Sequence, residues 1–148
     1  MLSPLLHADF MARALDESRR ALPLCRPNPP VGCVIARGDV LLTTGYTNPP
    51  GQYHAEAMAL AALTADQKSL PFNVYVTLEP CSFFGRTPSC ARTLLEYPVD
   101  TVFVSLIDPD PRNNGKGVEI LRSAGIRVEV GLLEERVKPF LQQYLSSP

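Results

Sequence analysis

Apolar and polar positions along the chain follow two periodicities, and the changes between them predict ten elements. Apolar residues such as Leu6, Phe10 and Ala14 recur at helical spacing with charged residues between them. Short β-branched runs predict strands, and the turn at 37–39 joins two of them into a hairpin. Predicted helices cover residues 6–22, 54–63, 90–96, 118–124 and 134–145, and predicted strands cover 31–36, 40–44, 73–78, 101–106 and 126–130.

The order of these elements predicts the fold class. From residue 73 onward strands and helices alternate, which favours parallel strands joined by right-handed crossovers, while the hairpin at 31–44 forms an antiparallel edge. The run at 101–106 is apolar nearly throughout and predicts a central strand. No internal repeat or domain boundary is visible. We therefore expect residues 1–148 to form one α/β domain, with three α/β/α layers and a mixed five-stranded sheet.

Composition narrows the classes of protein. The chain has 148 residues, 45% of them hydrophobic, which is typical of one globular domain. A net charge of −1 argues against a strongly basic nucleic-acid binder. No apolar stretch approaches the roughly 20 residues of a membrane span, and the N-terminus lacks the basic region of a signal peptide. We expect a cytoplasmic protein that binds neither nucleic acid nor a membrane.

Cysteine usage points to a metal or core role. Four cysteines are too few for a disulfide scaffold of this length. Cys33 lies inside an apolar strand and is expected to be a small buried hydrophobic residue. Cys25 lies in a proline-rich loop, and neither residue is expected to bind a metal.

Three residues at element junctions form a candidate zinc site. His54 opens a helix, Cys81 follows a strand and Cys90 opens the next helix. One imidazole and two thiolates suit Zn²⁺, and three protein ligands leave the open position of a catalytic site. Glu56 lies two residues after His54, where side chains lean back toward the helix start, so it can act as acid and base beside the metal. A closed structural zinc site and unliganded core cysteines are the alternatives.

Seven segments together resemble the riboflavin-pathway pyrimidine deaminases, the deaminase part of the bifunctional riboflavin biosynthesis deaminase/reductase, within the cytidine/deoxycytidylate deaminase superfamily. Eight residues separate Cys81 from Cys90, whereas cytidine and tRNA-adenosine deaminases have PCxxC. The resemblance covers nearly the whole chain, which stops where the reductase would begin, so no reductase domain is expected. The matching segments are 27–35, 54–56, 77–82, 85–90, 108–111, 115–117 and 123–126.

The resemblance implies a zinc-dependent hydrolytic deamination of a 2,5-diamino-6-ribosylamino-pyrimidinone 5′-phosphate. It assigns Zn²⁺ to His54, Cys81 and Cys90 and proton transfer to Glu56. It also assigns contacts with the substrate: Asn28 would bind the ring, while Arg86 and Asp108 would lie near the ribose phosphate. The expected partners are this small molecule and further copies of the chain, and a separate reductase is left open.

Three positions depart from the family pattern. Phe83 stands where the family has a histidine, and it offers the substrate site an apolar, stackable face. Thr47 occupies the place of a second histidine. Asp110 replaces the second Asx of Asp-Pro-Asn-Pro, and its charge would repel a phosphate unless a cation neutralises it. The candidate cations are Arg86, Arg112 and Lys116.

These departures leave other functions open. A deaminase repurposed for another aminopyrimidine, an aminopurine or a nucleoside is the first alternative. A nucleic-acid editing deaminase is a second, which the low net charge disfavours. A non-catalytic binding module stabilised by zinc is a third, and the presence of Glu56, which a structural site does not need, argues against it.

Overall fold

The computed structural model describes residues 4–83, 85 and 87–145 and confirms every predicted helix and strand. The helices are α1 (Pro4–Arg19), α2 (Ala55–Ala61), α3 (Cys90–Leu94), α4 (Lys116–Ser123) and α5 (Glu134–Leu141), with short 3₁₀ turns at Gln67–Ser69 and Gln142–Tyr144. The strands are β1 (Gly32–Arg37), β2 (Val40–Tyr46), β3 (Phe72–Leu78), β4 (Val99–Leu106) and β5 (Arg127–Val130). α1 ends three residues before its predicted end, because tighter turns replace the helical pattern after Arg19.

The strands form one mixed sheet in the order β2-β1-β3-β4-β5. β1 is antiparallel to both β2 and β3, while β3, β4 and β5 are parallel, as the alternation of elements predicts. The middle strand is β3, so the prediction of a central strand at 101–106 is correct only in that β4 is interior. Both strands have neighbours on each side, and both are therefore buried along almost their whole length.

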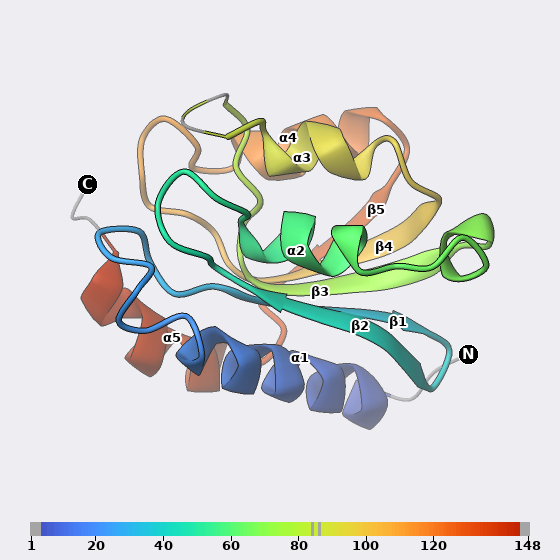
Figure 1. Cartoon of the computed structure of the whole chain (residues 1–148), viewed down its shortest axis with the longest axis horizontal. Coiled ribbons are helices and arrows are strands. Elements are labelled where there is room, and N and C mark those ends of the chain that lie inside the picture. Colours follow the sequence, from blue (N-terminus) through green and yellow to red (C-terminus); the bar gives the residue numbers. More distant parts are fainter. Residues whose placement is uncertain (1–3, 84, 86, 146–148) are drawn as a thin grey trace.

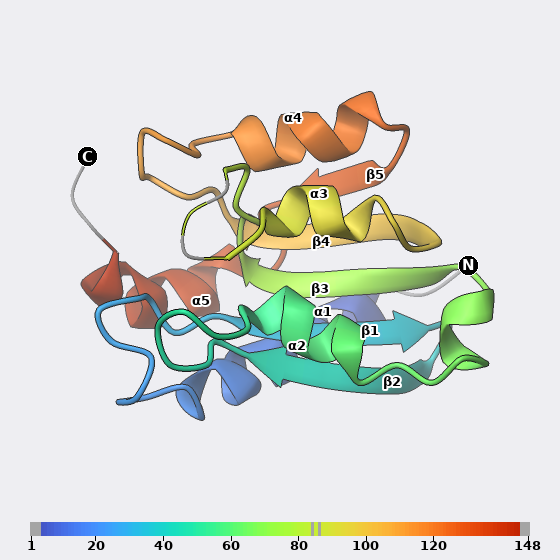
Figure 2. The same ribbon diagram turned by 45° about the horizontal axis from the view of Figure 1, so that its top comes forward.

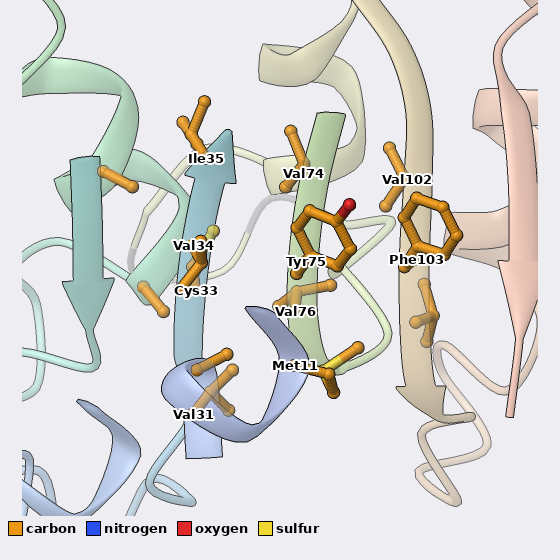
Figure 3. Packing of buried hydrophobic residues seen from close by; sticks show 14 of the residues in the cluster. Met11, Val31, Cys33, Val34, Ile35, Val74, Tyr75, Val76, Val102 and Phe103 are labelled. Atoms are coloured by element: carbon orange, nitrogen blue, oxygen red, sulfur yellow. The ribbon is translucent and has the colours of Figure 1, made fainter. Parts of the chain in front are cut away.

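Helices cover both faces of the sheet, which gives the expected three layers. α1 and α5 lie on one face, and α2, α3 and α4 lie on the other (Figures 1 and 2). Figure 3 shows side chains of β1, β3 and β4 meeting Met11 of α1 in the core. There the ring of Tyr75 stacks on Phe103 with centroids 4.7 Å apart, and the Tyr75 hydroxyl lies 2.6 Å from His7 Nδ1. Among the described residues, no helix is long and apolar enough to cross a membrane.

The strand directions bring distant parts of the sequence to one edge of the sheet. β3 and β4 run in parallel, so the segments that follow Leu78 and Leu106 start side by side. β1 runs the opposite way, so the proline-rich loop before Gly32 lies at the same edge. Because α2 begins there too, loops from four regions of the sequence meet around one point, at the edge of a parallel sheet where ligands commonly bind.

Candidate metal and catalytic site

The three candidate ligands meet at this edge. His54 Nδ1 lies 3.7 Å from Cys81 Sγ and 3.3 Å from Cys90 Sγ, and the three ligand atoms all lie within 4.8 Å of one another. Tetrahedral Zn²⁺ with the usual bond lengths separates a nitrogen and a sulfur ligand by about 3.5 Å. The donor set and its spacing therefore fit a zinc ion.

Close packing and short hydrogen bonds position the ligands. A Cβ on Gly45 would lie 2.2 Å from the Ala55 carbonyl oxygen, so β2 and the first turn of α2, next to His54, approach each other through a residue without a side chain. The Ser89 hydroxyl caps α3 by accepting the Arg92 N–H and donates to the Cys81 carbonyl at 2.7 Å. This hydroxyl fixes the position of one cysteine relative to the other.

Hydrogen bonds within the cluster shift the pKa values of the two thiols in opposite directions. The Cys90 thiol and backbone N–H both donate to Cys81 Sγ and lower the Cys81 pKa to about 4, with help from His54. Donation of that bond and burial raise the pKa of Cys90 well above its usual range. The hydrogen bond to Cys81 also raises the pKa of His54. The cluster thus holds one preformed thiolate that attracts a cation.

Glu56 has the environment of a proton-transfer group. Its side chain is buried, with 4% of its surface exposed, at the start of α2. Burial, followed by the negative charge of Cys81, raises its pKa to about 7. A carboxyl group near neutrality can both accept and return a proton.

A cavity of about 190 Å³ adjoins the cluster and contains most of the predicted site. Its lining includes the predicted substrate residues Asn28, Phe83 and Asp108. The fourth, Arg86, lies outside the described residues. The substrate roles of all four remain predictions. Within the described part of the chain, the Asn28 side-chain amide has no hydrogen-bond partner and is free for a ligand. The described lining also includes His54, Glu56, Cys81, Glu79, Asp110 and Arg112.

Asp108 lies in the loop that follows β4, and it lines the cavity. Burial raises the pKa of its carboxyl group, while its oxygens accept the Asp110 N–H at 3.0 Å and the Asn113 amide at 3.4 Å. The same carboxylate therefore both shapes its loop and lines the cavity.

The three departures from the family pattern have structural partners. Arg112 binds Asp110 through both carboxylate oxygens and lies 4.7 Å above the Phe83 ring. The bonds to Arg112 lower the pKa of Asp110, so of the three candidate cations Arg112 is paired with this charge. Thr47 is buried and instead accepts the Val31 N–H at 3.0 Å, which ties the proline-rich loop to β2.

Sequence reasoning missed two residues that support this site. Glu79 is buried and accepts backbone N–H groups from three residues that belong to the loop after β4 and to α4, at 2.9–3.1 Å. Thr87 places its hydroxyl 3.1 Å from His54 Nε2. Both belong to matched segments, but only the fold shows what they contact. Cys25 and Cys33 are fully buried and lie outside the ligand cluster, as expected.

Comparisons with known proteins agree with this geometry. A family described as the cytidine and deoxycytidylate deaminase zinc-binding region matches residues 5–106. A diaminohydroxyphosphoribosylamino-pyrimidine deaminase of Buchnera aphidicola subsp. Acyrthosiphon pisum is 38% identical over 131 residues, which cover 88% of each chain. The chain belongs to this deaminase family.

Longer members of the family are equally similar over part of their length. The riboflavin biosynthesis protein RibD of Chlamydia pneumoniae is 41% identical over 139 residues, which are 92% of this chain but 36% of that protein. A structure of Acinetobacter baumannii RibD superposes with a TM-score of 0.89 at 40% identity, over 96% of this chain and 40% of that one. The chain thus spans little more than a third of these relatives, and it has the cytidine-deaminase-like fold that they share.

Proposed function

We propose that the protein catalyses the zinc-dependent hydrolytic deamination of an aminopyrimidine, the riboflavin-pathway 2,5-diamino-6-ribosylamino-pyrimidinone 5′-phosphate. The observation that carries the proposal is the buried Glu56 carboxyl beside a His/Cys/Cys cluster, with both facing one cavity. The similarity to a deaminase of that name supports this choice of substrate.

In the proposed reaction, the residues around the cavity have different roles. His54, Cys81 and Cys90 would hold the zinc ion, which when bound supplies a Lewis acid that lowers the pKa of water. Glu56 would take a proton from the attacking water and return it to a ring nitrogen. It would then take the second proton of the same oxygen, now bonded to the ring carbon, and give it to the departing amine. Its pKa of about 7 suits transfer in both directions near neutral pH.

Other residues of the predicted site would bind the substrate. The free amide of Asn28 would bond the ring, and Asp108 would bond the sugar. Phe83 would stack against the ring or the sugar, and Arg86 would bind the phosphate, as a guanidinium suits phosphate oxygens. The proposal also includes a cytoplasmic location and self-association.

A repurposed deaminase is the second candidate, and one observation favours it. The Arg112 guanidinium is paired with the Asp110 carboxylate, so the described lining of the cavity contains no unpaired guanidinium that could bind a phosphate. A substrate without a phosphate would not need one. The two candidates therefore differ in whether the phosphate matters.

Ammonia release from matched substrates tests both candidates. The parent should release ammonia from the phosphorylated pyrimidine, and Glu56→Gln should lose nearly all activity while it retains zinc. Arg86→Ala should mainly raise KM for the phosphorylated compound. Equal activity on the unphosphorylated compound would favour the repurposed enzyme, and an active Glu56→Gln would overturn the role of Glu56.

A further inference from the structure

The two ring nitrogens of His54 face different partners. Nδ1 points to the cysteine sulfurs, at 3.3 and 3.7 Å. Nε2 lies on the other side of the ring, 3.1 Å from the hydroxyl oxygen of Thr87. Thr87 contributes no ligand atom to the cluster, and its side chain is half-buried.

This arrangement matters because a neutral imidazole carries one N–H, and a metal binds only the nitrogen that lacks it. An acceptor at Nε2 stabilises the tautomer that leaves Nδ1 free for the metal, and it fixes the plane of the ring. A threonine hydroxyl can accept that N–H and turn its own hydrogen away.

We propose that Thr87 is a positioning residue that holds His54 in the zinc-binding orientation and tautomer. The inference rests on the zinc site of the proposed function, but not on its substrate. The loop around Thr87 is built to place it: the Gly85 N–H donates to the Thr87 carbonyl at 3.1 Å, and Ser89 ties the loop end to Cys81. These bonds of Gly85 and Ser89 thus place the Thr87 hydroxyl beside Nε2 of His54.

The size of the effect depends on access of water to Nε2. Loss of such a partner typically weakens metal binding about 10–100-fold. Thr87 and His54 also line an open hollow of about 670 Å³, whose lining shares only His54 with that of the catalytic cavity. Water from this hollow can replace part of the lost hydrogen bond, so we expect the lower end of that range, roughly tenfold.

Zinc affinity of three variants tests the proposal without any substrate. Thr87→Val keeps the shape and removes the hydroxyl, and it should bind zinc about tenfold more weakly in competition with a chelating dye. Thr87→Ser should stay within about threefold of the parent, because it restores the hydroxyl. Thr93→Val is the matched control, since Thr93 lines the same hollow but its hydroxyl donates to the Ser89 carbonyl and should matter little.

Parent-like affinity in Thr87→Val would overturn the proposal, as would an equal loss in Thr87→Ser or in Thr93→Val. A second measurement applies if Thr87→Val does not fold. Long-range ¹H–¹⁵N spectra of the zinc-loaded parent should show the His54 proton on Nε2, and this proton should exchange faster with water in Thr87→Ala. A proton on Nδ1, or equal exchange in both proteins, would contradict the inference. Absence of ammonia release would refute the proposed function and leave these readouts unaffected.

Discussion

Replacing Glu79 by glutamine tests how the catalytic edge is held together. Its carboxylate accepts the N–H groups of Asp108 at 3.1 Å, Gly115 at 2.9 Å and Val118 at 3.0 Å, with 3% of the residue exposed. In Glu79→Gln the remaining carbonyl oxygen can serve the first two donors. The new amide nitrogen then faces the Val118 N–H, donor against donor.

The expected cost follows from these contacts. An unsatisfied buried N–H costs about 1–3 kcal/mol, and loss of the negative charge weakens each of the other two bonds by roughly 0.5–1 kcal/mol. The sum is about 3 kcal/mol, which for a domain of this size lowers the Tm by roughly 6–12 °C. Asp108 should also lose its fixed position, so KM should rise.

Urea and thermal unfolding of the parent and Glu79→Gln measure this cost. Glu17→Gln is the matched control, because Glu17 is as buried as Glu79 but, among the described residues, its carboxylate pairs only with the exposed arginines Arg13 and Arg20. Each such pair contributes at most about 1 kcal/mol, so Glu17→Gln should lose less stability than Glu79→Gln. If the two variants lose the same stability, or Glu79→Gln loses none, Glu79 does not hold the loop as argued.

Two further variants test the core and the mouth of the cavity. Burial raises the pKa of Tyr75 to about 12, so the folded state keeps a proton that the unfolded chain loses from pH 10 upward, and stability falls as pH rises toward 12. Tyr75→Phe removes the hydrogen bond to His7, so at pH 7 it should be about 1 kcal/mol less stable than the parent. Near pH 12 it should be the more stable of the two proteins. Parallel curves of unfolding free energy against pH would contradict this expectation. Asp110→Asn should lower KM for the phosphorylated substrate by roughly threefold to tenfold, because it frees Arg112 and removes a repulsive charge worth about 1 kcal/mol. An equal change for an unphosphorylated substrate would show that no phosphate lies there.

The periodicity of the sequence predicted the helices and strands, but not the order of the strands in the sheet. The alternating run at 73–78 and the apolar run at 101–106 marked β3 and β4, and both strands are buried on two faces. Because both strands are buried, the sequence does not show which of these two interior strands is the middle strand of the sheet. The end of α1 was placed too late, because Ala21 stays buried beyond the helix and continues the apolar pattern.

Sequence alone predicts the site residues whose side chains are typical metal ligands. A histidine and two cysteines at element junctions indicate a metal regardless of the fold. Glu79 and Thr87 carry no such mark, because their partners lie 29–39 and 33 residues away and become neighbours only through the sheet order. Arg112 was one of three candidate cations for Asp110, and only the local turn decides that it reaches the carboxylate.

The departures from the family pattern fall into two independent groups. Phe83, Asp110 and Arg112 form one contact set: the ring supports the guanidinium, and the guanidinium neutralises the carboxylate. Arg112 is the member that contacts both others, so replacing it would remove the partner of Phe83 and of Asp110 at once. Thr47 belongs to a different contact, in which its hydroxyl bonds the backbone of Val31. The altered set lies at the mouth of the cavity, whereas His54, Glu56 and the cysteines match the family pattern. A change of substrate can therefore occur at the mouth without any change in the proton-transfer chemistry beneath it.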